Sequence, residues 1–147
     1  MPVSYTHLDV YKRQIFGIEP RPGSQLVVTP GTHSKWAMVE DAVIQNFRTY
    51  MTGELYAVLR QHSILGRLMT GQEGQSIDET SFMDGVHNAF EDQDLLHSLF
   101  DVRTQALFQR KQSDKLASYL SGILIGSEVS GAVRHYDLDS AVVVRCV

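Results

Sequence analysis

Hydrophobic positions in the first third of the chain follow the patterns of β-strands. A short, unbroken apolar run within residues 25–29 suits a strand that is buried on both faces. Apolar and polar residues alternate in residues 35–40 and again in residues 43–51, and Glu40-Asp41 between them favours a turn. The pattern therefore predicts three consecutive strands in an antiparallel meander.

After residue 51 the apolar period becomes helical. Helices are expected from a cap at Thr52 to about Gly66, from Ser76 or Asp78, after a cap at Asp94, and from Ser113-Asp114 to about His135. Residues 70–76 are polar and glycine-rich and would connect the first two helices, and residues 141–144 would form a strand without a neighbour. This order is typical of an α+β domain or of part of a larger α/β fold.

The periodicity also predicts which residues face the core. In the third strand, alternation places Phe47 on one face and Ile44 on the other. The expected helix faces are, in chain order, Leu55, Val58, Leu59 and His62; Phe82, Val86, Ala89 and Phe90; Leu95, Leu96, Leu99, Phe100 and Val102; and Leu116, Leu120, Ile123, Leu124 and Val129. His62 is interpreted as a core histidine rather than a catalyst.

Three glycines, Gly122, Gly126 and Gly131, flank the apolar stripe of the last helix. Each glycine costs about 1 kcal/mol relative to alanine inside a helix, so the group indicates that another backbone passes very close. Two interpretations remain open, namely close packing of this helix on a sheet and room for a ligand.

The composition narrows the functional classes. A net charge of −4 without a basic stripe argues against a nucleic-acid interface. One cysteine, Cys146, fits a reducing compartment, and no apolar run reaches the ~18 residues of a membrane span, so a cytoplasmic protein is expected. The six histidines lack metal-ligand spacing, and we predict no metal site.

Residues 30–36, PGTHSKW, lie at the expected tip of the first hairpin. Gly31 permits a positive φ and a close approach of a ligand to the backbone. Side chains that can donate hydrogen bonds follow it at Thr32, His33, Ser34 and Lys35. This set, without a carboxylate, suits a phosphate group, although an ordinary polar hairpin is the alternative and no Walker motif is present.

A second polar cluster, Thr52-Gly53-Glu54, lies where the third strand passes into the first helix. It is either an ordinary helix start, or it holds an anion and faces the same cleft as the hairpin tip. Arg103 is either a surface side chain or an anchor for an acidic ligand. A His33–Ser34 hydrolase pair is rejected, because neighbouring residues of a strand point to opposite faces.

The segment VTPGTHSKWAMVEDAVIQNFRTYMTGELYAVLRQHSILG resembles the central part of 2-dehydro-3-deoxygalactonokinases, and LFDVRTQAL and YLSGILIGSEVSG resemble later parts of that family. The resemblance spans about residues 14–144. It implies transfer of the γ-phosphate of ATP, with Mg²⁺, to 2-dehydro-3-deoxy-D-galactonate, which gives the 6-phosphate. It also implies a two-lobed α/β fold like that of actin, hexokinase and Hsp70, in which a turn matching Gly31–Lys35 contacts the nucleotide phosphates.

This chain departs from the family in length. Residues 1–14, MPVSYTHLDVYKRQ, resemble translated sequencing-adapter DNA, so we interpret them as an artefact, residues 15–24 as a linker and residues 25–147 as most of the second lobe. The catalytic base should precede Gln14 and stays unassigned, so little or no kinase activity is expected of this chain.

The partners would be a sugar acid and a nucleotide, without nucleic acid or membrane. A non-catalytic α+β binding module and a different sugar kinase of the same fold are the alternatives; the oligomeric state is not indicated.

Overall fold

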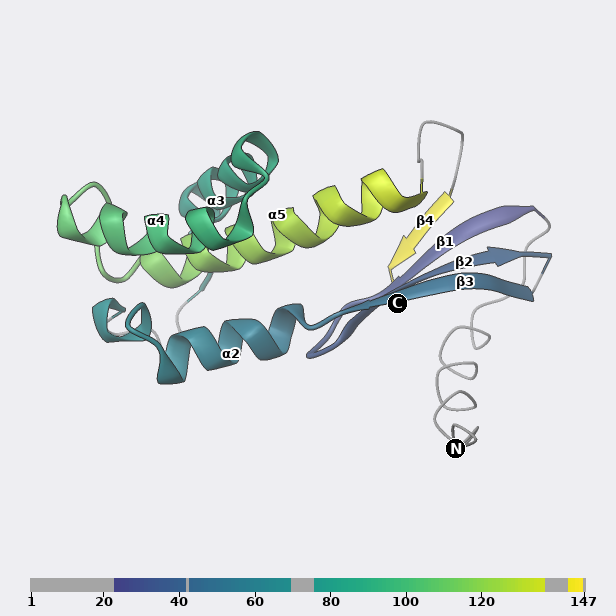
Figure 1. Ribbon diagram of the computed structural model, residues 1–147, viewed down its shortest axis with the longest axis horizontal. Coiled ribbons are helices and arrows are strands. Elements are labelled where there is room, and N and C mark those ends of the chain that lie inside the picture. Colours follow the sequence, from purple (N-terminus) through teal and green to yellow (C-terminus); the bar gives the residue numbers. More distant parts are fainter. Residues whose placement is uncertain (1–22, 42, 70–75, 137–142, 147) are drawn as a thin grey trace. The chain divides into compact units, whose positions relative to one another are not determined.

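The computed structural model describes residues 23–41, 43–69, 76–136 and 143–146. The chain divides into two compact units (Figure 1). We call Met1–Tyr50 with Leu138–Val147 the sheet unit, and Met51–Asp137 the helical unit. The interpretation of residues 1–14, and most of the linker assigned to residues 15–24, lie outside the described residues.

The sheet unit contains four strands in the order β3-β2-β1-β4, which are β1 (Ser24–Thr29), β2 (Ser34–Glu40), β3 (Val43–Tyr50) and β4 (Val143–Cys146). The first three pair antiparallel, which confirms the predicted meander. β4, yellow in Figure 1, runs parallel to β1, with Val143 opposite Gln25. The expectation that the last strand lacks a neighbour was therefore wrong, because a parallel partner can lie far away in the sequence.

A β-bulge changes the expected alternation of β3. Met38 pairs with Asn46 whereas Val39 pairs with Ile44, so one extra residue interrupts the ladder. Ile44 therefore packs on the buried cluster of Val27, Ala37 and Val39. Phe47 is opposite Ala37 and shares this face, so the prediction that Ile44 and Phe47 face opposite sides was wrong.

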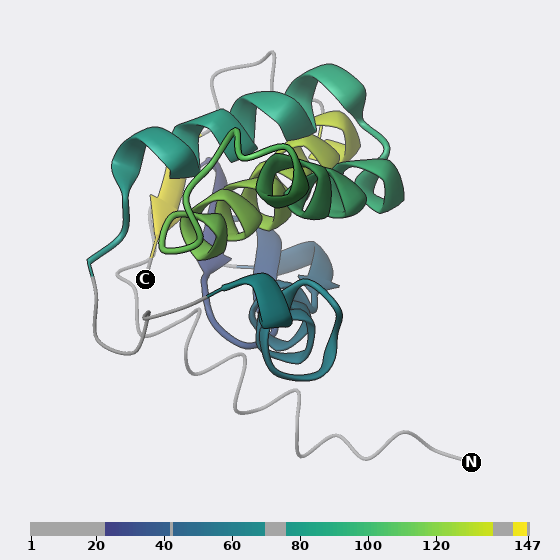
Figure 2. The ribbon, with the colours of Figure 1, turned by 90° about the vertical axis from the view of Figure 1, so that its left-hand side faces the viewer.

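The helical unit contains α2 (Thr52–His62), η1 (Gly66–Leu68), α3 (Glu79–Asp92), α4 (Leu95–Leu107) and α5 (Leu116–Tyr136). Figures 1 and 2 show α5 between α2 on one side and α3 on the other, and α4 also packs on α5. The core of the helical unit is centred on α5. It consists of Leu65, Val102, Leu116, Tyr119, Leu120, Ile123 and Leu124. The prediction of about four helices is confirmed.

Side-chain caps set the start of two helices where the sequence predicted them. The Asp78 carboxylate accepts a hydrogen bond from Ser81 N at 2.9 Å, and the Asp94 carboxylate accepts bonds from Leu96 N and His97 N at 3.1 and 3.2 Å. The prediction of a Thr52 cap was wrong, because Thr52 is already the first helical residue and Met51 precedes it without a side-chain cap.

Several predicted core positions are exposed, namely Val58, His62, Phe90, Leu96 and Phe100. α2 contacts the core through Leu55, Tyr56 and Leu59, and α4 contacts it through Leu95, Leu99 and Val102. α2 and α4 thus bury only some of the apolar residues on their predicted faces. For α5 the prediction was correct at Leu116, Leu120, Ile123 and Leu124, which are at most 4% exposed.

The glycines of α5 serve helix packing. A Cβ added at Gly122 would lie 2.0 Å from the carbonyl oxygen of Phe82, and one added at Gly85 of α3 would lie 2.2 Å from the carbonyl oxygen of Tyr119. At Gly126, a Cβ would lie 3.0 Å from the backbone of Val86. The predicted close approach is confirmed at Gly122 and Gly126, but the partner is helix α3 rather than a sheet.

By length and composition alone, α5 could also cross a membrane. However, 67% of its most apolar window is buried inside the protein, and α5 supplies most of the core of the helical unit. Its apolar character is therefore explained by its position as a core helix.

Candidate functional site

The hairpin turn predicted to bind phosphate links β1 to β2 in the sheet unit. Thr29 pairs with Lys35 and closes the turn, and residues 31–33 at its tip are exposed. Gly31 does not have a positive φ, so the turn does not use that freedom of glycine. Nothing lies within 4 Å of the position that a Cβ of Gly31 would occupy, so a ligand can approach the backbone here.

Ser34 and Lys35, the last two predicted phosphate-binding residues, point to different faces of the sheet. Ser34 is only 2% exposed and is opposite Tyr50 in β3, whereas Lys35 is opposite Thr49. The Lys35 ammonium donates a hydrogen bond to the carbonyl oxygen of His33 at 2.7 Å. The positive charge of Lys35 is therefore held against the exposed turn, while Ser34 belongs to the interior of the sheet unit.

The second predicted cluster lies at the start of α2. The Thr52 hydroxyl donates a hydrogen bond to a carboxylate oxygen of Glu128 at 2.5 Å. Glu128 lies on α5 and is 9% exposed, so this carboxylate is nearly out of water. A negative charge near the amino end of a helix is favourable, and here a side chain of the protein provides it.

The sequence interpretation missed Glu128. It is the only acidic residue in the 21 residues of α5, and its neighbours in the sequence ILIGSEVSG are small or apolar. A carboxylate in such a helix must be paired to be buried, so its isolation in the sequence was a usable signal. Its partner Thr52 could not be inferred, because the two residues are 76 positions apart.

Arg103 lies in α4 and is half-buried. It makes no hydrogen bond or ion pair with Thr52, Gly53, Glu54 or any other residue in the described ranges. α4 packs on α3 and α5, whereas α2 packs on α5 and η1. Among the described residues, Arg103 is thus not joined to the start of α2 by a hydrogen bond or an ion pair.

Two of the shifted pKa values in the helical unit belong to the contact between α4 and α5. Burial raises the pKa of Asp101, but hydrogen bonds from Thr104, Tyr119 and Gln105 outweigh it and hold this pKa below its ordinary value. Burial, then the bond to Asp101, raises the pKa of Tyr119 far above its ordinary value. These groups join α4 to α5 and are not part of the hairpin turn.

A second pair links α3 to α4. The Asp92 carboxylate accepts a hydrogen bond from His97 Nδ1, and this bond raises the pKa of His97 and lowers the pKa of Asp92. In the part of the chain that the structure describes, no group of three or more His, Cys, Asp or Glu side chains could hold a metal ion.

The model of a family described as 2-keto-3-deoxy-galactonokinase matches residues 12–145. The chain belongs to this family. The match confirms the family resemblance seen in the sequence, and it includes the hairpin turn, the start of α2 and all of the helical unit.

Two curated relatives support the galactonokinase assignment. The 2-dehydro-3-deoxygalactonokinase of Escherichia coli (strain K12) is 35% identical over 123 residues, which are 84% of this chain and 41% of the relative. The "Probable 2-dehydro-3-deoxygalactonokinase DgoK1" of Rhizobium meliloti (strain 1021) is 37% identical over 112 residues, which are 76% of this chain and 37% of the relative. The chain thus spans about two fifths of the length of these galactonokinases.

The fold also matches a solved structure. A crystal structure of "a putative 2-dehydro-3-deoxygalactonokinase protein" from Sinorhizobium meliloti aligns with a TM-score of 0.79 at 30% identity. The alignment covers 92% of this chain and 44% of that protein. The strands and helices described above are therefore those of the corresponding segment of a galactonokinase-family protein.

Proposed function

We propose that this chain carries the phosphate-binding turn of an ATP-dependent sugar-acid kinase. The kinase would transfer the γ-phosphate of ATP to the terminal hydroxyl of 2-dehydro-3-deoxy-D-galactonate and form the 6-phosphate. Family membership supports the reaction class, because curated relatives carry the name of this kinase. The single observation that supports the role of the turn is the Lys35 ammonium, which is held at the exposed turn by its bond to His33.

The chemistry of phosphoryl transfer explains why such a turn is useful. The reaction needs fixed positive charge and hydrogen-bond donors near the phosphates more than it needs covalent chemistry. In this proposal, the backbone N–H groups of residues 31–33 and the hydroxyl of Thr32 contact phosphate oxygens. Lys35 adds a positive charge, and the absence of a side chain at Gly31 leaves the backbone accessible.

The remaining contacts belong to the same proposal. Thr52, Gly53, Glu54 and Arg103 would contribute to the cleft or to binding of the sugar acid. The two-lobed fold of the actin, hexokinase and Hsp70 group would place the nucleotide between lobes in a cytoplasmic enzyme. Mg²⁺ would enter with ATP, and since no metal-binding group is found in the described residues, no step is assigned to an ion held by them.

Nucleotide titration of the 147-residue chain tests the role of the turn. In ¹H–¹⁵N NMR spectra, ATP should cause saturable shifts of the amides of residues 31–35. Lys35→Ala should raise the apparent Kd about tenfold, because a charge-assisted contact is lost. Arg67→Ala removes one positive charge at an exposed position of η1 and should leave the Kd unchanged.

Two outcomes would contradict the proposal. One is the absence of saturable shifts at the turn, and the other is an equal effect of Lys35→Ala and Arg67→Ala. Supplied with ATP and 2-dehydro-3-deoxy-D-galactonate, the chain itself should bind nucleotide with little or no turnover. Formation of the 6-phosphate above the protein-free rate would overturn that expectation.

A further inference from the structure

A pocket of about 230 Å³ lies within the helical unit. Its walls come from α2, from the segment that leads into α3, and from the first turns of α5. The lining residues are Tyr56, Arg60, Ser76, Ile77, Ala117, Ser118 and Ser121. None of them belongs to the hairpin turn or to Thr52–Glu54, so this pocket is not explained by the proposed function.

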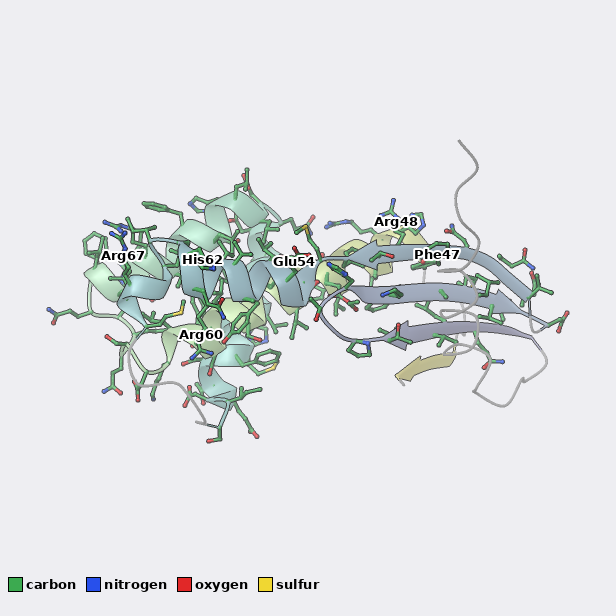
Figure 3. All side chains as sticks on the ribbon, turned by 90° about the horizontal axis from the view of Figure 1, so that it is seen from below. Phe47, Arg48, Glu54, Arg60, His62 and Arg67 are labelled. Atoms are coloured by element: carbon green, nitrogen blue, oxygen red, sulfur yellow. The ribbon has the colours of Figure 1, made fainter. Side chains whose placement is uncertain are left out.

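Among the described residues that line the pocket, Arg60 is the only charged one. Figure 3 shows Arg60 extending from α2 toward the segment that leads into α3, whereas Arg67 lies on η1. Arg60 is half-buried and makes no ion pair or hydrogen bond with any residue in the described ranges. A guanidinium that is partly removed from water without an anionic partner is costly, and a bound anion would offset this cost.

The polar groups around Arg60 are suited to the same ligand. Ser118 is only 8% exposed, and its Oγ accepts a hydrogen bond from Asp78 N at 3.0 Å. Because that bond uses a lone pair, the hydroxyl proton of Ser118 can still be donated to a ligand. Ser76, Ser121 and Tyr56 add three more hydroxyl groups, and none of the described residues that line the pocket carries a carboxylate.

We propose that this pocket binds the oxyanion group of a small metabolite, either a phosphate or a carboxylate. The Arg60 guanidinium would form a bidentate contact with two oxygens of the anion, which is the geometry that arginine favours. Ser118 and Ser121 would donate hydrogen bonds to the oxygens. Tyr56, Ile77 and Ala117 would contact a short carbon chain attached to the anion. The pocket volume suits a small ligand, since pockets that bind drug-sized ligands measure about 300–1,000 Å³.

Anion titration of the 147-residue chain tests this site. Inorganic phosphate and acetate are added separately at constant ionic strength, with sodium chloride as the balancing salt, and ¹H–¹⁵N NMR spectra are recorded. We expect saturable shifts at the amides of Ile77, Ser118 and Ser121. Arg60→Gln should raise the apparent Kd at least about tenfold, and the matched control Arg67→Gln should leave it unchanged.

The two probes separate the ligand classes. Saturation by phosphate alone assigns the site to phosphorylated ligands, saturation by acetate alone assigns it to carboxylates, and saturation by both supports a general oxyanion site. The proposal is overturned if neither anion saturates, or if Arg60→Gln and Arg67→Gln behave alike. This test is independent of ATP binding at the turn. ATP binding is followed at the amides of residues 31–35, whereas anion binding is followed at those of Ile77, Ser118 and Ser121.

A second measurement needs no substitution. Phenylglyoxal modifies accessible guanidinium groups, and mass spectrometry of the digested chain reports each arginine separately. Phosphate or acetate should slow the modification of Arg60 several-fold and leave that of Arg67 unchanged. Equal protection at both arginines, or protection at neither, would overturn the proposal. Ser121→Ala should weaken this protection, since a hydrogen-bond donor is lost.

Discussion

The α3–α5 contact and the hairpin turn between β1 and β2 both depend on glycine, but for opposite reasons. At Gly122 a Cβ would lie 2.0 Å from the carbonyl oxygen of Phe82, and the helices could not approach as they do. At Gly31 a Cβ would meet nothing within 4 Å, and the φ of this residue is not positive. The first region uses glycine for packing, and the second leaves an open backbone at its surface.

The comparison shows that the position of a glycine in the sequence pattern indicates its use. Gly122 interrupts a helical apolar stripe, where a glycine lowers helix stability unless a neighbour needs the space. Gly31 follows the end of a strand, where small residues are common for many reasons. Four substitutions sharpen this contrast between tight packing around α5 and openness at the turn.

Gly122→Ala should have the largest effect. The added methyl group collides with backbone atoms of α3, which cannot rotate away as a side chain could. We expect a loss of about 3 kcal/mol in the free energy of unfolding, despite the better helix propensity of alanine. Urea denaturation followed by far-UV circular dichroism measures it, and a loss below about 1 kcal/mol would show that the two helices separate easily.

Thr52→Val should have the next largest effect, on the other side of α5. Valine preserves the shape but removes the hydroxyl that donates to the buried Glu128 carboxylate. The expected loss is about 1.5 kcal/mol in the free energy of unfolding. Thr52→Ser retains the hydroxyl and serves as the control in the same urea titration. If both variants unfold at the same denaturant concentration, the hydroxyl contributes nothing measurable.

Asp101→Asn should change the pH dependence of stability by less than about 1 kcal/mol, because this carboxylate is partly exposed. Its pKa is lower in the folded chain than the ordinary value of 3.8, so its stabilising contribution is complete above that pH. The contribution is lost as pH falls through the lower folded pKa. Thermal unfolding between pH 6 and pH 2 should show a smaller decrease for Asp101→Asn than for the unsubstituted chain. The exposed control Asp114→Asn should retain the full decrease.

Gly31→Ala should have the smallest effect on stability. Because the position is open and its φ is accessible to alanine, the free energy of unfolding should change by no more than about 0.5 kcal/mol. The same substitution should weaken ATP binding several-fold, since the methyl group covers backbone that phosphate would contact. A large loss of stability would mean that Gly31 supports the fold and would remove the contrast with Gly122.

The order and type of the elements could be predicted because their signals are local. Alternation in residues 35–40, the caps Asp78 and Asp94, and the apolar stripe of α5 each act within a few residues. Family resemblance was also visible in the sequence, because the motif PGTHSKW and the segment after it are specific. These features need no information about distant parts of the chain.

The features that could not be predicted depend on contacts between distant residues. The parallel partner of β4, the bulge that turns Ile44 toward the core, and the Thr52–Glu128 bond all join separate segments. Exposure of Leu96 and Phe100 likewise depends on which face of α4 meets α5. At the hairpin turn, the donors and their alternation could be identified from the sequence, but not which of Ser34 and Lys35 would be buried.

The pairing of β1 with β4 also sets an order of events during synthesis of the protein. Val143 leaves the ribosome 118 residues after its partner Gln25, which at bacterial and eukaryotic elongation rates corresponds to roughly 6–24 s. β1 can pair with β2 during this interval, but β4, which covers its other edge in the folded chain, has not yet been made. An unpaired strand edge is a site of aggregation, so a nascent chain at this stage is expected to need protection by a chaperone. Stalled translation after residue 137 would prolong that exposure.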